Sequence, residues 1–147
     1  MTQHIRVRGI SKAYPNGVQA LDDINLEIQA GEIFGIIGRS GAGKATLLRL
    51  FNRLENADRG EMTISGVPIG EGARGQLRDL RRRVAMIFQH FNLHATKTVA
   101  ENGELTLRMA GIPAAERRHR VDDMLRLVGL ESLRNSFPGQ LSGGQKQ

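Results

Sequence analysis

Apolar residues along this chain follow two periods, one typical of strands and one typical of helices. Alternation occurs at Ile5 and Val7 and again across 24–28, where Ile and Leu alternate with Asn and Glu. We therefore predict two half-buried strands near the N-terminus. Continuous apolar runs at 33–37 and 84–88 predict two more strands, each buried on both faces.

Two segments carry apolar residues at helical spacing. The first covers 47–54, and the second begins after Pro113 and ends at Gly129, which is a favourable residue for a helix C-terminus. Strands and amphipathic helices in this order favour an α/β fold. The expected buried stripes are Leu47, Leu50, Phe51 and Leu54 in the first helix and Val121, Met124, Leu125 and Val128 in the second.

Short capping and turn motifs mark further elements. Thr98 with Glu101, and Ser142 with Gln145, have the spacing of a capping box, so each pair predicts the start of a helix. Ser65-Gly66 separates two short apolar alternations and predicts a hairpin.

A glycine-rich loop joins the apolar run 33–37 to the amphipathic segment 47–54. Its glycines let successive N–H groups point inward, and the N-terminus of the following helix adds a partial positive charge. Lys44 is placed to reach the β- and γ-phosphates, so the pattern predicts a site for a nucleotide triphosphate. The loop residues are Gly38, Arg39, Ser40, Gly41, Ala42, Gly43, Lys44, Ala45 and Thr46.

One position departs from the G-x-x-x-x-G-K-[ST] pattern. Ala45 stands where such loops offer a hydroxyl to Mg²⁺. Thr46 carries a hydroxyl, but one helical step turns it by about 100° around the axis. We therefore expect that Thr46 does not replace the missing ligand.

Composition narrows the class of protein. The 147 residues are 39% hydrophobic and include no cysteine, which excludes disulfides and thiolate metal sites. No apolar run approaches the roughly 20 residues of a membrane span, and the first residues lead into alternation instead of a signal peptide. We expect a cytosolic protein or one peripheral to a membrane.

The formal net charge of +6 raises the question of nucleic acid. Basic clusters at 78–83 and 117–120 contain no aromatic residues and lie among acidic ones, so solvated helix faces are the better interpretation. His90 and His94 have helical spacing, but no third ligand is near them in sequence and 91–93 is not helical in pattern, which disfavours a metal site.

Two more segments are candidates for ligand contact. Gln89 follows the second apolar run, and ligands gather at the carboxyl ends of strands in open α/β sheets. The glycines after Ser142 would open the amino end of a helix as a second anion site. On these residues alone, a glycine-rich loop without a ligand is an equal alternative for this second segment.

Taken together, the motifs resemble those of the ABC-transporter ATPases, because the loop is followed by Leu141-Ser142-Gly143-Gly144-Gln145, with Ser142 98 residues after Lys44. The resemblance implies that Tyr14 stacks on adenine and that Gln89, in the Q-loop, touches Mg²⁺ and the attacking water. It also implies that Ser142, Gly143, Gly144 and Gln145 clamp the γ-phosphate of ATP held by a second copy, so that the working unit is a homodimer. The implied fold is a P-loop NTPase with N-terminal antiparallel strands, a parallel core sheet and the start of a helical subdomain.

Within this family, segments 51–55, 86–93 and 141–147 are similar to the ATP-binding subunits of bacterial methionine importers, although importers of other amino acids share much of the pattern. This similarity implies ATP-driven amino-acid uptake, with methionine as the substrate. It also implies membrane permease subunits, a substrate-binding protein that acts through them, and a peripheral position on the cytoplasmic face of the bacterial inner membrane.

The resemblance divides the chain into a core over 1–93, a helical subdomain over 94–141 and the signature over 141–147. In the family, the Walker B carboxylates and the switch histidine would follow Gln147, so we expect no catalytic residue in this chain, which resembles a fragment or a truncated gene product. Hydrolysis by the chain alone is then expected to be very slow or absent. The alternative function is a non-hydrolytic nucleotide-binding remnant. A DNA-associated ATPase is disfavoured by the short interval between loop and signature.

Overall fold

The chain forms two compact units, Met1–Met86 and Ile87–Gln147. The structure is a computed structural model and describes residues 3–70 and 74–147. The first unit contains the antiparallel sheet and the phosphate loop, and the second contains two packed helices and the signature segment.

The sheet of the first unit contains β1 (Gln3–Ala13), β2 (Gln19–Gln29), β3 (Arg59–Ile64) and β4 (Val67–Pro68). The strand order is β2-β1-β3-β4, and every neighbouring pair is antiparallel. Val7 in the central strand pairs with Leu26 on one side and Met62 on the other. The two alternating strands expected near the N-terminus are therefore confirmed, and both are longer than the alternation alone indicated.

The hairpin between β3 and β4 is also confirmed. Its two turn residues, Ser65 and Gly66, have φ values of 50° and 76°. Positive φ at both positions is what a type I′ turn requires, and this turn matches the twist of the flanking strands.

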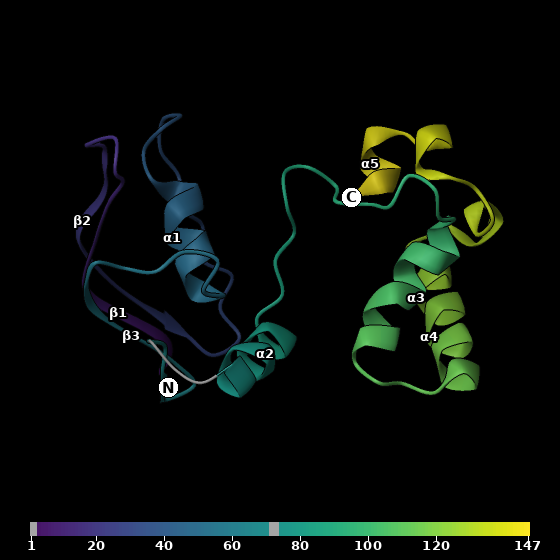
Figure 1. Cartoon of the computed structure of the whole chain (residues 1–147), viewed down its shortest axis with the longest axis horizontal. Helices are drawn as coiled ribbons and strands as arrows, with labels where there is room; N and C mark the ends of the chain where they lie inside the picture. Colours follow the sequence, from purple (N-terminus) through teal and green to yellow (C-terminus); the bar gives the residue numbers. More distant parts are fainter. Residues whose placement is uncertain (1–2, 71–73) are drawn as a thin grey trace. The chain divides into compact units, whose positions relative to one another are not determined.

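Helix α1 (Lys44–Phe51) packs against this sheet (Figure 1). Leu47, Leu50 and Phe51 are buried as the helical spacing predicts, and Thr46 is buried as well. The helix ends at Phe51 and leaves Leu54 outside it, 42% exposed. The core combines one stripe of the helix with inward positions of β1, β2 and β3. Its buried members are Val7, Ile10, Leu21, Leu47, Leu50, Phe51, Met62 and Ile64.

The two buried strands predicted from the apolar runs are wrong for this structure. Residues 33–37 and 84–88 form no strand, and Ile33 and Ile37 are 101% and 95% exposed. A strand buried on both faces requires hydrogen-bonded neighbours, and the described part of the chain supplies none beside either run. The parallel core sheet expected from the resemblance is therefore not formed here, and the sheet is wholly antiparallel. Helix α2 (Arg74–Arg83) precedes the second run.

The second unit is built on α3 (Val99–Met109) and α4 (Ala114–Leu127), which lie side by side (Figure 1). At Gly103 a Cβ would lie 3.6 Å from the side chain of Val121, which is an ordinary van der Waals contact, so the packing of the two helices does not require glycine there. Two short 3₁₀ turns, η1 (Glu131–Leu133) and η2 (Pro138–Gln140), lead to α5 (Gly143–Lys146).

The predicted boundaries of these helices are confirmed, but half of the α4 stripe is not buried. Thr98 caps α3, Pro113 occupies the N-cap of α4, and Gly129 follows its C-terminus with φ 70°. Val121 and Leu125 are buried, whereas Met124 and Val128 are 57% and 62% exposed. The stripe is narrow because α3 covers only one side of α4. None of the helices in the described ranges is both long and apolar enough to cross a membrane.

Candidate functional site

The phosphate loop is held against the sheet by Gly43. This residue has φ +80°, and a Cβ added to it would overlap the carbonyl oxygen of Ala20 in β2. Gly41 has the same φ, but open space surrounds its Cα. Only glycine therefore fits position 43 on both conformational and steric grounds, and this fixes where α1 begins.

The amino end of α1 is left open for a ligand. Its N-cap is Gly43, which provides no side-chain cap, and the first turn contains no acidic residue. The N–H groups of this turn and the partial positive charge of the helix N-terminus are therefore available to an anion. The residues at this end fit a phosphate group.

Lys44 lies within the loop it is expected to serve. Its Nζ donates to the carbonyl oxygens of Gly38 and Arg39, both at 2.7 Å. These two bonds close the loop around the ammonium group, so its positive charge is directed into the loop. The positive charge is therefore positioned in the loop before a phosphate chain binds.

The residues after Lys44 face different surroundings. Ala45 is exposed, and its methyl group can ligate no metal. Thr46 is buried, with 7% exposure, and its hydroxyl is hydrogen-bonded to the phenol of Tyr14 at 3.1 Å. The structure thus brings together Tyr14 and the loop, but it supplies no hydroxyl at position 45. Tyr14 is half-buried.

Asp58 anchors the segment that leads to Tyr14. Its carboxylate accepts the backbone N–H of Ala13 at 2.7 Å and the ammonium of Lys12 at 2.9 Å. The bond from Ala13, followed by that from Lys12, lowers the pKa of Asp58, and the bond to Asp58 raises the pKa of Lys12. Sequence analysis missed this contact, because a residue 45 positions from Ala13 gives no local signal beyond its turn composition.

Gln89 belongs to the second unit, where it is exposed in an irregular segment. The segment that follows is organised by Asn102, which the sequence analysis did not single out. Its side chain accepts the N–H of His94 at 2.8 Å and donates to the carbonyls of His94, Lys97 and Thr98. The side-chain amide of Asn102 therefore fixes the backbone of residues 94–98, just before α3.

The signature segment forms the expected capped start of a helix. Ser142 accepts the N–H of Gln145 at 3.3 Å, and the Gln145 side chain accepts the N–H of Ser142 at 2.9 Å. Gly143 and Gly144 are exposed in the first turn of α5. These four residues are thus arranged on one exposed helix start.

The histidines and arginines outside these segments are accounted for by local structure. His90 and His94 lie in irregular backbone and share no helix face, and the described ranges hold no group of three or more His, Asp or Glu side chains suited to a metal. Arginines of α4 pair with nearby acids, as Arg117 does with Glu104 at 2.8 Å and Arg126 with Glu131 at 3.0 Å. These pairs fit the interpretation of charged, solvated helix faces.

Comparison with known proteins identifies the class. Residues 21–147 match the family described as ABC transporter, and the chain belongs to this family.

Its curated relatives are more specific. The chain is 51% identical over 146 residues to methionine import ATP-binding protein MetN 3 of Shouchella clausii, covering 97% of this chain and 43% of that protein. It is also 51% identical over 141 residues to the MetN 3 protein of Bacillus cereus, covering 96% of this chain and 41% of the relative. The chain therefore spans about two fifths of the length of these relatives.

Solved structures confirm the ABC ATPase fold. A dimeric structure of MJ0796, described as a bacterial ABC transporter cassette, superposes with a TM-score of 0.87 at 34% identity over 97% of this chain and 65% of that one. The cbiO1 protein of Clostridium perfringens, described as part of the transporter complex cbiONQ, superposes with a TM-score of 0.86 at 30% identity, covering 99% of this chain and 58% of that one. The resemblance to the ABC-transporter ATPases, inferred from the motifs, is thus confirmed.

Proposed function

We propose that this chain is the nucleotide-binding part of an ABC importer ATPase that couples ATP hydrolysis to uptake of an amino acid, and that this amino acid is methionine. The observation that carries the proposal is the phosphate loop, in which Gly43 sets the start of an uncapped helix and Lys44 points into the loop. The loop fits the phosphates of ATP, with Tyr14 on the segment that would meet the base. The 51% identity to methionine import proteins supports the substrate.

The residues of this chain support a Mg²⁺ site less directly than they support a phosphate site. Mg²⁺ prefers oxygen ligands, and position 45 offers none. We assign Gln89, in the Q-loop, as the residue of this chain that would contact Mg²⁺ and the attacking water. When bound, Mg²⁺ would neutralise charge on the phosphates, and Lys44 would do the same from the protein side.

The further parts of the proposal concern assembly. Ser142 to Gln145 would contact the γ-phosphate of ATP held by a second copy, in a homodimer that joins permease subunits and, through them, a substrate-binding protein at the cytoplasmic face of the bacterial membrane. Support comes from the exposed, capped start of α5 and from the dimeric state described for MJ0796. The proposed division is a core over 1–93, a helical subdomain over 94–141 and the signature over 141–147.

A second candidate, non-hydrolytic nucleotide binding, is favoured by Ala45. Phosphate release from ATP with Mg²⁺ separates the two candidates. Steady release by the purified chain that disappears in Lys44→Ala supports hydrolysis. Saturable ATP binding without release supports the second candidate, and absence of both contradicts the phosphate-loop assignment.

A further inference from the structure

A cavity of about 450 Å³ lies in the first unit, between the β3–β4 hairpin and α2. Its volume falls within the roughly 300–1,000 Å³ that small-molecule sites occupy. The lining is mainly apolar, which suits a hydrocarbon group, and among the described residues it includes none of the phosphate loop. The apolar members of the lining are Ile64, Val67, Pro68, Ile69, Leu80 and Val84.

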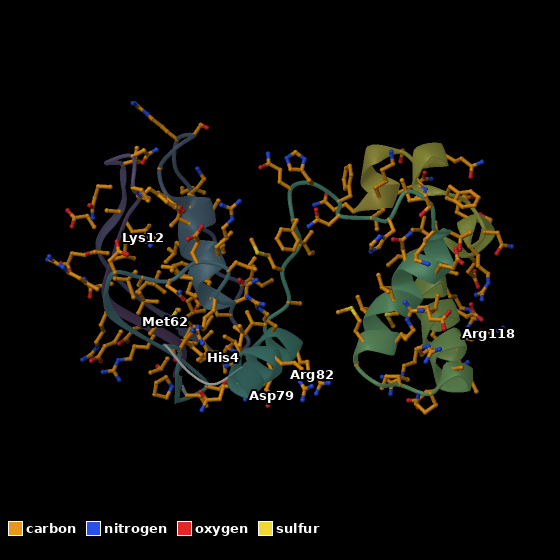
Figure 2. The ribbon with its side chains drawn as sticks, viewed as in Figure 1. His4, Lys12, Met62, Asp79, Arg82 and Arg118 are labelled. Atoms are coloured by element: carbon orange, nitrogen blue, oxygen red, sulfur yellow. The ribbon has the colours of Figure 1, made fainter. Side chains whose placement is uncertain are left out.

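Charged residues from two places in the chain also line this cavity. Arg53 lies just after α1, and Arg83 is the last residue of α2. Asp79, exposed on α2 (Figure 2), belongs to the lining as well, so two arginines and one aspartate give it a net charge of +1. Guanidinium groups bind carboxylates through paired N–H donors. A ligand with one negative charge would balance the lining, whereas Asp79 would repel the second charge of a phosphate monoester.

Arg53 occupies a backbone conformation that favours glycine. Its φ is 53°, in the left-handed region. The turn that ends α1 requires this conformation, because the N–H of Arg53 donates to the carbonyl of Leu50 at 3.0 Å. The following N–H, that of Leu54, donates to the carbonyl of Arg49 at 2.9 Å. Glycine would form the same turn with less strain, so the turn does not account for the arginine side chain.

We propose that this cavity is a binding site for a small aliphatic carboxylate, whose hydrocarbon chain contacts the apolar lining and whose carboxylate pairs with Arg53 and Arg83. Different parts of the lining then recognise the two parts of the ligand, so both charge and chain length determine its affinity. Because the site is separate from the phosphate loop, it does not depend on the proposed nucleotide binding.

Calorimetric titration of the full chain with three probes tests the two parts of the site. Octanoate should bind roughly tenfold more tightly than hexanoate, because the apolar lining removes two more methylenes from water. Octanoate should also bind at least about threefold more tightly than octanol, which has a chain of the same length but no charge.

Variants of the charged residues test which side chains hold the carboxylate. Arg53→Gln and Arg83→Gln should each weaken octanoate binding about three- to tenfold. Asp79→Asn removes a repulsive charge and should tighten octanoate binding about threefold. Arg78→Gln is the matched control, because Arg78 is exposed on the same helix but does not line the cavity. Its octanoate affinity should stay within about twofold of the wild-type chain.

Urea unfolding of Arg53→Gly separates ligand binding from the turn. This variant should weaken octanoate binding as Arg53→Gln does, without lowering the urea midpoint, because glycine suits the left-handed conformation. If Arg53→Gln does not fold, Arg83→Gln and Asp79→Asn still decide, since a variant that is only destabilised would not bind octanoate more tightly.

Four results would overturn the inference. They are no saturable octanoate binding by the folded wild-type chain, equal affinities for octanoate and octanol, equal affinities for octanoate and hexanoate, and a loss in Arg78→Gln as large as that in Arg83→Gln.

Discussion

The ammonium group of Lys44 lies 2.7 Å from the carbonyl oxygen of Gly38, at the opposite end of the same loop. A bond of equal length reaches the carbonyl of Arg39. The lysine therefore holds the loop closed through main-chain oxygens. A phosphate chain entering the loop would exchange these neutral acceptors for negatively charged oxygens, which attract the ammonium group more strongly.

We propose that the residue at position 45 sets how strongly nucleotide binding depends on Mg²⁺. Ala45→Ser returns a hydroxyl to an exposed position in the first turn of α1. We predict that this variant binds ATP about tenfold more tightly in the presence of Mg²⁺, which corresponds to about 1.4 kcal/mol for one added ligand. Affinity without Mg²⁺ should not change. Calorimetric titration with ATP, with and without Mg²⁺, measures these affinities for the wild-type chain and Ala45→Ser. If the two proteins bind ATP equally well in both conditions, this hydroxyl does not limit metal binding.

Gly43 and Gly41 provide a matched pair for the steric fit of the loop. Both have φ +80°, but only at Gly43 would a Cβ overlap the backbone of Ala20. Gly41→Ala should cost about 1–2 kcal/mol for the left-handed conformation. Gly43→Ala should cost about 2–5 kcal/mol, because steric overlap adds to the same conformational term.

Urea unfolding of both alanine variants without nucleotide measures the difference. Equal free energies of unfolding for Gly41→Ala and Gly43→Ala would contradict the close packing of the loop against β2.

Local chemistry explains which elements could be predicted from the sequence. The capping boxes of Thr98 and Ser142 and the hairpin at Ser65-Gly66 each depend on residues within a few positions of one another. The same is true of the loop glycines and Lys44. Because each of these features is made by residues close together in the sequence, the spacing of those residues is sufficient to predict it.

The features that sequence reasoning missed depend on distant partners. The run 33–37 has the composition of a buried strand, but a strand also requires neighbours, and Ile33 remains fully exposed in the structure. The contacts of Tyr14 with Thr46 and of Ala13 with Asp58 span 32 and 45 residues. No periodicity or local motif indicates a pair at such separation.

Acid should weaken the attachment of the Tyr14 segment through Asp58. Hydrogen bonds from Ala13 and then Lys12 lower the pKa of Asp58 below its ordinary value of 3.8. A carboxylate with a lowered pKa in the folded state stabilises the protein above the unfolded pKa, and this contribution is lost as pH falls through the folded pKa. The stabilisation from Asp58 should therefore be constant above about pH 5 and decline below pH 3.8.

The urea midpoints of the wild-type chain and Asp58→Asn, measured across this range, test the pH dependence. The gap between them should narrow as the solution is acidified below pH 3.8. Asp22→Asn, at an exposed position of β2, is the control for removal of a surface charge. A gap that stays constant with pH, or that Asp22→Asn reproduces, would contradict the role of the Asp58 carboxylate.

Arg81 stabilises the carboxyl end of the phosphate-loop helix. Its guanidinium donates to the carbonyl of Asn52 at 3.1 Å and to that of Arg53 at 2.9 Å, just after α1 ends. Arg81→Met should lower the free energy of unfolding by about 1–3 kcal/mol, because two carbonyls lose a charged donor.

The neighbouring arginine is the matched control for this variant. Arg82 pairs with Asp79 on the exposed side of α2, at 3.8 Å (Figure 2). Arg82→Met should change stability by less than about 0.5 kcal/mol. The free energies of unfolding of both methionine variants are measured with urea. Equal decreases in the two would show that the contact of Arg81 with the end of α1 stabilises the protein no more than the exposed ion pair of Arg82 does.

The central claim is that the loop from Gly38 to Thr46 binds the phosphates of a nucleotide, and calorimetric titration of the monodisperse chain with ATP tests it most directly. We predict saturable binding of one ATP per chain, with affinity reduced at least about tenfold in Lys44→Ala because the charge at the centre of the loop is lost. Binding of equal affinity in the wild-type chain and Lys44→Ala, or no binding by a folded wild-type chain, would contradict the claim.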